Sequence, residues 1–391
     1  MANERYEVSE ILHHLGERNL PEHSVAPPVF QTSIFCFNSF EEFQAALADE
    51  ASSYLYTRGN NPTVNLCEEK LAALEHAERA KLVGSGVAAI SCAVLGQVRS
   101  GDHVVSVADT YSWTRNLFSV YLERFGVSVT YVDGCRIEEF EEAIRPNTKV
   151  IYLESPATFT FKLQPLREVA DLARSKGIKT IIDNTWATPI YQNPIDYGID
   201  IVVHSASKYM GGNSDLVAGA IMGSDEDVKH IFNTEFLQLG PVPDPHMAWL
   251  IMRGLRTLHV RMPVHYSNAL ALAEFLEGRE EVESVLYPFL PSFPQYGLAK
   301  EQMRGGSGLF SFRLKTRKLE DVKKFTNSLR FFKRAVSWGG YESLVVPNAT
   351  NNFHGQPIPD DRISLIRVHA GLEDVKLLKE DMASALATMG S

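Results

Sequence analysis

The sequence is short of cysteine, of positive charge and of long apolar runs, and each shortage narrows the classes of protein it can belong to. Its four cysteines, Cys36, Cys67, Cys92 and Cys135, form no Cys-x-x-Cys pair and lie near no histidine cluster. A metal site or a disulfide framework is therefore not expected, and scattered cysteines are typical of a reducing compartment. Lysine and arginine number 38 against 48 aspartates and glutamates, a balance that argues against nucleic acid as a partner.

No segment has the character of a secretory signal or of a membrane span. The N-terminal string MANERYEVSEILHHLGERN is polar and charged, without the apolar stretch that a signal peptide needs. No run of about 18 apolar residues occurs, so no transmembrane helix is expected. The sequence therefore predicts a cytoplasmic protein with no membrane partner.

What the sequence does contain is a regular alternation of apolar runs and helical patterns between about residues 62 and 225. Short runs rich in β-branched residues lie at 103–107, 179–182 and 199–203, and helical patterns lie at 64–75 and 166–175. This alternation predicts a mostly parallel sheet covered on both faces. Sheets of this kind bind ligands at the carboxyl ends of their strands.

The pattern changes around residues 241–245, where we expect a domain boundary. One long connecting helix is predicted over 246–276, and a mixed region with a final helix at 373–387 follows it. Residues 1–55 show little periodicity and predict an extended arm with one short helix at about 40–48. The predicted domains are an arm over 1–55, a large α/β domain over 56–245, and a smaller C-terminal α+β domain over 246–391.

Three short motifs in the alternating region carry polar groups that suit a phosphorylated carbonyl ligand. Asp183 ends an apolar run, and the run at 199–203 leads into Ser205, Ser207 and Lys208. A buried lysine beside hydroxyl groups can attack a carbonyl carbon. Taken alone, the aspartate could cap a turn and the lysine could lie in a polar surface loop.

The third motif is VGSGVAAI, in which Ser85 and Gly86 precede an apolar helix. Free N–H groups at a helix N-terminus form an anion site, although a lone Gly-Ser-Gly is usually just a turn. A lysine, an acid for a pyridine nitrogen and a phosphate cup are together what pyridoxal phosphate (PLP) requires of a protein. The combination therefore predicts a PLP site.

The sequence resembles the trans-sulfuration (Cys/Met metabolism) family of PLP-dependent enzymes from about Tyr54 to about Asp381. The strings that carry the resemblance include YLYTRGNNPT, GSGVAAI, IIDNTWATPIYQNP, HSASKYMGGNSD, MRGLRTLHVRM and IRVHAGLED. The resemblance implies PLP-dependent transferase fold type I, whose large domain has a mostly parallel seven-stranded sheet. It also implies pyridoxal 5'-phosphate as the cofactor.

Within the family, the strings DNTWA, SWGGYESL and ESPATFTF resemble those of bacterial cystathionine β-lyases. Synthases and γ-lyases of the family usually have Asn-Pro in place of Thr158-Phe159 and Leu rather than Trp338. The implied reaction is cleavage of L-cystathionine to homocysteine, pyruvate and ammonia by a homotetramer with shared active sites.

The resemblance also implies roles for particular residues. Lys208 would carry PLP as a Schiff base and move a proton, Asp183 would pair with the pyridine nitrogen, and Tyr111 would stack on the ring. The other expected cofactor ligands are Gly86, Val87, Ser205 and Ser207, with Tyr56 and Arg58 reaching the phosphate of a neighbouring subunit. The expected substrate contacts are Arg367, which would grip the α-carboxylate through a bidentate pair, together with Ser337, Trp338 and Tyr56. No metal ligand is expected, and His103, His204, His246 and His369 are assigned no role.

Departures from the family pattern leave the substrate open. Val336 stands where bacterial β-lyases tend to have Tyr and cystathionine γ-lyases often have Glu, and Asn213-Ser214 stands where a His is common. Cystine and other cysteine S-conjugates are further candidate substrates. A methionine γ-lyase, an activity like that of cystathionine γ-synthase or γ-lyase, and a PLP-binding protein without catalysis are the alternative functions.

Overall fold

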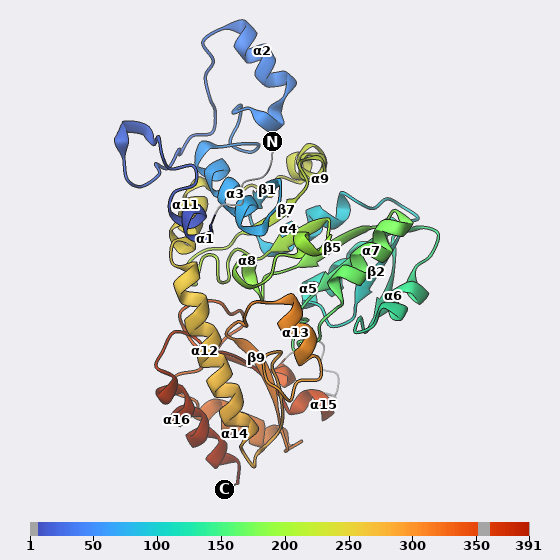
Figure 1. The fold of residues 1–391 in the computed structure, drawn as a ribbon, viewed down its shortest axis with the longest axis vertical. Helices are drawn as coiled ribbons and strands as arrows, with labels where there is room; N and C mark the ends of the chain where they lie inside the picture. Colours follow the sequence, from blue (N-terminus) through green and yellow to red (C-terminus); the bar gives the residue numbers. More distant parts are fainter. Residues whose placement is uncertain (1–6, 351–359, 391) are drawn as a thin grey trace. The chain divides into compact units, whose positions relative to one another are not determined.

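The computed structural model describes residues 7–350 and 360–390, which divide into two compact units (Figure 1). Of these residues, the first unit takes those up to Ser155 together with Gln164–Gly211 and Asp215–His259. The second unit takes Pro156–Leu163, Gly212–Ser214 and the residues from Val260 onward. The predicted domain bounds at 1–55, 56–245 and 246–391 remain a proposal.

The first unit is built on a seven-stranded sheet with the strand order β1-β7-β6-β5-β4-β2-β3. Strands β2 to β6 pair in parallel, and β7 runs antiparallel to both of its neighbours. The strands are β1 (Arg79–Val83), β2 (His103–Val107), β3 (Ser128–Val132), β4 (Thr148–Glu154), β5 (Lys179–Asp183), β6 (Ile201–His204) and β7 (Gly219–Gly223). The predicted fold type, with its mostly parallel seven-stranded sheet, is confirmed.

Both faces of this sheet are buried because side chains alternate along each strand. Ile181 packs into one core cluster and Ile182 into the other, and Val202 and Val203 divide in the same way. Helix α4 (Gly86–Leu95) contributes to the first cluster, and α6 (Ile137–Ala143) and α7 (Leu166–Lys176) contribute to the second. Buried parallel strands of this kind are expected to be rich in Val and Ile, as these are.

The other helices of the first unit begin and end at recognisable signals. Helix α3 (Pro62–Glu75) has Asn61 as N-cap and proline at its first position, an arrangement that favours helix initiation. The remaining helices with at least one residue in this unit are α1 (Val8–His13), α2 (Phe40–Ala48), α5 (Ser112–Asn116), α8 (Thr188–Tyr191), α9 (Asp225–Ile231), α10 (Leu237–Leu239), α11 (Pro245–Leu255) and the start of α12 (Leu258–Glu277).

The second unit contains a five-stranded sheet with the order β10-β11-β12-β9-β8, in which every pair except β10–β11 is antiparallel. Its strands are β8 (Val282–Leu286), β9 (Leu309–Leu314), β10 (Lys333–Arg334), β11 (Leu344–Pro347) and β12 (Leu365–His369). Its helices after α12 are α13 (Tyr296–Gln302), α14 (Leu319–Ser328), α15 (Asp360–Ile363) and α16 (Val375–Leu386). The predicted smaller α+β region is thus present.

Two differences between the structure and the sequence-based expectations have a clear physical cause. The long helix predicted over 246–276 is two helices, α11 and α12, separated at Arg256 and Thr257. A Cβ on Gly254 would clash with the carbonyls of Met210 and Gly211, so close packing of the chain precedes the break. Strand β1 was not predicted because its sequence, RAKLV, carries two positive charges.

Within residues 7–350 and 360–390, no helix has the length and apolar character needed to cross a membrane.

Candidate active site

The carboxyl ends of the central parallel strands bring together residues that are far apart in the sequence. Asp183 is the last residue of β5 and lies in register with Glu154, the last residue of β4. Tyr111 follows β2, and its backbone N–H donates to Glu154 Oε2 at 2.8 Å. The backbone of Tyr111 is therefore fastened to the residue that neighbours Asp183.

Asp183 is half-buried and receives two hydrogen bonds from Thr185. The Thr185 N–H donates to Asp183 Oδ1 at 2.9 Å, and the Thr185 hydroxyl donates to the same oxygen. Burial raises the pKa of Asp183 above its usual value, and the Thr185 hydrogen bonds and electrostatic interactions with His204 and Lys208 oppose that rise. Thr185 and Lys208 thus favour the ionised carboxylate, the form that can pair with a protonated ring nitrogen.

Lys208 lies in the turn that follows β6 and is half-buried. Its backbone N–H donates to Ser205 O at 3.1 Å, and its ammonium group lies near enough to Asp183 to lower the pKa of that carboxyl. The structure therefore brings the predicted lysine and the predicted acid together at adjacent strand ends.

The N-terminus of α4 lies directly against the turn that carries Ser205. The Ser85 hydroxyl caps α4 by accepting from the Ala88 N–H at 3.1 Å. A Cβ on Gly86 would lie 2.8 Å from Ser205 Cβ and 2.9 Å from its Oγ. Because glycine alone permits this approach, Gly86 and Ser205 form a narrow cradle beside free N–H groups, which is the chemistry of an anion site.

The other two predicted phosphate ligands differ in their surroundings. Val87 is the second residue of α4, and 37% of its surface is exposed. The Ser207 hydroxyl donates to Ala218 O at 3.1 Å and accepts from the Ala218 N–H at 2.9 Å. Ser207 therefore also fastens the chain that leads into β7.

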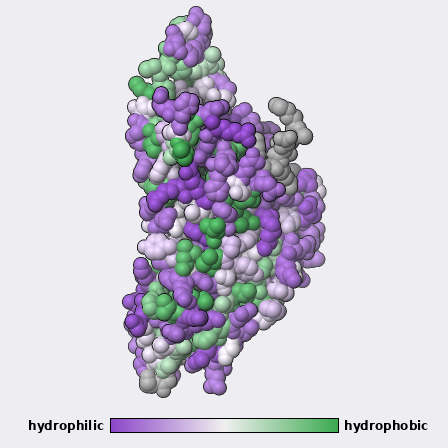
Figure 2. All heavy atoms as spheres, turned by 60° about the vertical axis from the view of Figure 1, so that its left-hand side comes forward, coloured by the Kyte–Doolittle hydropathy of each residue, from purple (hydrophilic) through white to green (hydrophobic). Residues whose placement is uncertain are grey.

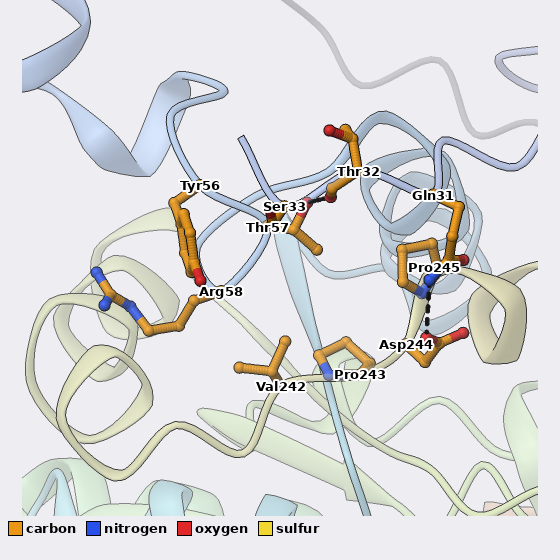
Figure 3. Close-up of a pocket in the computed structure, with 10 residues that line it drawn as sticks. All are labelled: Gln31, Thr32, Ser33, Tyr56, Thr57, Arg58, Val242, Pro243, Asp244 and Pro245. Carbon is orange, nitrogen blue, oxygen red and sulfur yellow. Dashed lines mark hydrogen bonds between the residues drawn. The ribbon is translucent and has the colours of Figure 1, made fainter. Parts of the chain in front are cut away.

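Tyr56 and Arg58 line a hollow of about 440 Å³ in the first unit (Figure 3). The guanidinium carbon of Arg58 lies 5.6 Å from the centre of the Tyr56 ring, and Arg58 Nη2 lies 3.7 Å from Glu50 Oε1. Both side chains are nearly half exposed. The ten lining residues come from the segments 31–33, 56–58 and 242–245, and neither Lys208 nor Asp183 is among them.

In the second unit Arg367 lies in the middle of β12, hydrogen-bonded in register between Val346 of β11 and Ser311 of β9. Its guanidinium carbon lies 4.9 Å from the centre of the Phe159 ring. A central strand holds its backbone rigidly, so the direction in which the side chain leaves the sheet is set.

The predicted substrate residues Ser337 and Trp338 lie on a loop with two positive φ angles, +81° at Ser337 and +86° at Gly339. The Gly339 N–H donates to His369 Nε2 at 3.1 Å, so His369 Nδ1 carries the proton and donates to Glu342 O at 3.0 Å. His369 belongs to β12, two residues after Arg367. The loop with Ser337 and Trp338 is therefore fastened to the strand that carries Arg367.

Comparison with known proteins identifies the family to which the chain belongs. The profile of the Cys/Met metabolism PLP-dependent enzymes matches residues 9–387. The chain belongs to this family. An L-methionine gamma-lyase of Porphyromonas gingivalis is 40% identical over 373 residues, which cover 93% of each chain.

Two other members of the family are similar over nearly their whole length. A "Putative cystathionine beta-lyase" of Rhizobium johnstonii is 37% identical over 382 residues, or 96% of this chain and 95% of the relative. The crystal structure of metB from Corynebacterium glutamicum matches with a TM-score of 0.91 and 34% identity over 98% of both chains. The predicted trans-sulfuration family and its cofactor, pyridoxal phosphate, are confirmed.

The residues at the strand ends fit this cofactor. Asp183 offers a carboxylate to the ring nitrogen, Lys208 offers an amine to the aldehyde, and the Gly86–Ser205 cradle at the start of α4 offers donors to the phosphate. Tyr111 is 42% exposed, and its backbone is bonded to Glu154 beside them. The individual roles of these residues remain proposals.

Sequence reasoning missed three residues that shape the site. Thr185 links Asp183 to the cradle because its hydroxyl also accepts from the Ser205 N–H at 2.8 Å. An aspartate followed two residues later by a hydroxyl residue is a signal of such a turn. Glu154 could have been found as a carboxylate at a strand end, whereas the link from His369 to Gly339 leaves no signal in the sequence.

Proposed function

We propose that this protein is a PLP-dependent carbon–sulfur β-lyase that cleaves L-cystathionine to homocysteine, pyruvate and ammonia. The observation that carries the proposal is the meeting of Lys208 with Asp183 at adjacent strand ends, beside the Gly86–Ser205 cradle. An amine and an acid at adjacent strand ends, beside an anion site, suit PLP chemistry on an amino acid. Cystine and other cysteine S-conjugates are further proposed substrates.

PLP, when bound, withdraws electrons from Cα of the amino acid and so makes its proton acidic. The Lys208 amine removes that proton and returns one to the departing sulfur. The Asp183 carboxylate would pair with the ring nitrogen and favour its protonated form, and the Tyr111 ring would stack on the ring of the cofactor. Arg367 grips the substrate carboxylate through two parallel hydrogen bonds, while Ser337 and Trp338 line the rest of the substrate pocket.

Cleavage at Cβ rather than Cγ is supported by two segments of the second unit. The loop that carries Trp338 and the turn that carries Phe159 differ from the Leu and the Asn-Pro usual in synthases and γ-lyases of the family. The second candidate is methionine γ-lyase, which is favoured by the 40% identity to a lyase of that name. γ-Elimination needs a further proton transfer at Cβ, so the two activities give different products.

The phosphate contacts of Tyr56 and Arg58 are proposed to be made in a neighbouring subunit of a homotetramer. Helix α2 supports such an assembly because Phe40, Phe43 and Leu47, spaced along one face, are 73%, 44% and 59% exposed. Figure 1 shows α2 standing apart from the sheet of its unit, and Figure 2 shows apolar patches among hydrophilic side chains. Exposed apolar faces of this kind mark interaction surfaces. The proposed location is the cytoplasm, in keeping with four free cysteines.

The test is a product assay with the purified PLP-loaded enzyme on cystathionine, cystine, methionine and O-acetylhomoserine. Pyruvate from cystathionine, released together with homocysteine, is the expected result. 2-Oxobutyrate from methionine at a higher kcat/KM than pyruvate from cystathionine would replace the β-lyase proposal with the γ-lyase one. No product from any of the four would remove both.

A further inference from the structure

Phe159 has a backbone conformation that an aromatic residue rarely adopts. Its φ is +61°, in the left-handed region that bulky side chains avoid. The Thr160 N–H donates to Thr158 O at 2.7 Å and closes a three-residue turn centred on Phe159. Three-residue turns with positive φ at the centre are rare and strained, so the surrounding structure must hold this one in place.

The neighbouring Phe161 shows what an ordinary cause of such strain looks like. Its φ is +56°, and its side chain is fully buried. Its N–H donates to Ala157 O at 2.9 Å, and the Ala157 N–H donates to Lys162 O at 2.9 Å. Burial of the Phe161 ring and these two bonds account for its conformation. Phe159 is half-buried, so burial alone does not account for the second strained position in the same turn.

The contact that the Phe159 conformation creates is with Arg367. The guanidinium carbon lies 4.9 Å from the ring centre, within the range of a cation–π interaction. All five N–H bonds of a guanidinium lie in its plane. A ring that packs against the face of the guanidinium restricts its orientation and leaves the in-plane bonds to a carboxylate.

We infer that Phe159 is a positioning residue that orients Arg367 for the α-carboxylate of the amino acid substrate. The inference rests on the proposed role of Arg367 in the lyase reaction. The strained conformation of Phe159 places its ring beside the guanidinium of Arg367. Ligands with a carboxylate depend on Phe159, and ligands that lack one do not.

The experiment compares variants that differ in the ring and keep the turn. Phe159→Gly removes the ring and suits a positive φ, and Phe159→Asn is a second ringless variant that tolerates this conformation. Phe159→Tyr keeps the ring. The matched control is Phe331→Gly, because Phe331 forms another cation–π pair in this unit, with Arg330 at 5.8 Å.

Binding is measured by calorimetry on the PLP-loaded enzyme with L-alanine, which has no leaving group, and with L-alaninamide, which lacks the carboxylate. We expect both ringless variants to weaken L-alanine binding about three- to thirtyfold and to leave L-alaninamide binding unchanged. KM for cystathionine should rise by a similar factor, with kcat within about twofold. Phe159→Tyr and Phe331→Gly should bind both ligands as the parent enzyme does.

Arg367→Ala separates this inference from the proposal on which it rests. If Arg367→Ala loses L-alanine binding and the ringless variants do not, the role of Phe159 is wrong and that of Arg367 stands. If Arg367→Ala binds L-alanine and L-alaninamide as before, the proposed carboxylate grip fails as well. Equal weakening of both ligands by Phe159→Gly and Phe159→Asn also overturns the inference, because the ring would then not act through the carboxylate.

Discussion

The two units hold their functional side chains in different ways. In the first unit the parallel strands all end at one edge of the sheet, so Asp183, Glu154 and Lys208 meet there although they come from three strands or the turns after them. In the second unit the strands around Arg367 run antiparallel, and their carboxyl ends lie at opposite edges. Arg367 therefore leaves the middle of a strand.

The difference shows which structural features position the functional side chains of each unit. A parallel sheet positions its ligand residues by strand geometry alone, with short turns such as the one that carries Thr185. In the antiparallel sheet, segments outside the strands contact the strand that carries Arg367. The turn of Phe159 contacts Arg367, and the Gly339 loop is hydrogen-bonded to His369 of the same strand. This comparison of the two units predicts that substitutions in the first unit lower the rate of the reaction. Substitutions in the second unit are predicted to weaken binding of the substrate carboxylate.

The largest expected effect is that of Lys208→Ala. Removing the amine that moves the proton should lower pyruvate formation from cystathionine by about 10²- to 10⁴-fold, measured by a coupled assay on the PLP-loaded enzyme. Lys179→Ala is the control, because Lys179 is a half-exposed lysine paired with Asp227 and Asp200. A Lys208→Ala enzyme with full turnover would show that pyruvate formation does not depend on the Lys208 amine.

Lys81→Met tests how the first unit supports its strand ends. Lys81 is buried on β1, and its Nζ donates to Gly59 O at 2.8 Å and lies 3.1 Å from Glu68 Oε1. The variant leaves Glu68 buried without its partner, so we expect the free energy of unfolding to fall by about 3–5 kcal/mol. Denaturant titration measures the loss.

The control for Lys81 is Lys229→Ala, which removes an exposed pair with Asp225 and should change the free energy of unfolding by less than about 0.5 kcal/mol. Hydrogen exchange should place the loss of protection for Lys81→Met in the seven-stranded sheet. Loss confined to the second unit would contradict this assignment.

Thr185→Val should change the pH dependence more than the maximal rate. The variant loses the hydroxyl bond that stabilises the ionised Asp183, so the pKa of Asp183 rises. Because the reaction needs the carboxylate ionised, the acidic limb of the kcat profile should move to higher pH. Thr185→Ser keeps the hydroxyl and should keep the parent profile. A limb that stays in place in Thr185→Val would mean that Asp183 does not set it.

The smallest expected effect concerns His265 in the second unit. Burial lowers the pKa of His265 to about 4, so between that pH and about 6.5 the unfolded chain binds the proton that the folded chain refuses. Stability should therefore fall with decreasing pH across this window, by at most about 1.4 kcal/mol per pH unit from this group. In His265→Gln that contribution should vanish from the slope of unfolding free energy against pH. An unchanged slope would assign the acid sensitivity to other groups, such as His103 in the first unit.

Much of the first unit follows from local patterns, and its exceptions have physical causes. Asp183 and Lys208 stand directly after apolar runs, so their place at strand ends could be predicted. Strand β1 escaped prediction because the charge of Lys81 is neutralised by Glu68, a partner on α3. The break between α11 and α12 escaped because the apolar pattern continues across it, while the constraint comes from the backbone packed against Gly254.

By itself, the sequence determined the family, the cofactor and the alternating sheet, because these depend on strings of neighbouring residues and on hydrophobic periodicity. Tertiary contacts decided the surroundings of each residue with a proposed catalytic or binding role. Thr185 bonded to Ser205, Gly86 against Ser205, and Phe159 beside Arg367 are contacts between residues far apart in the sequence. The first could be predicted, because Thr185 and Ser205 follow adjacent parallel strands. The contact of Phe159 with Arg367 could not, because it depends on a strained turn 208 residues earlier in the chain, which no local pattern encodes.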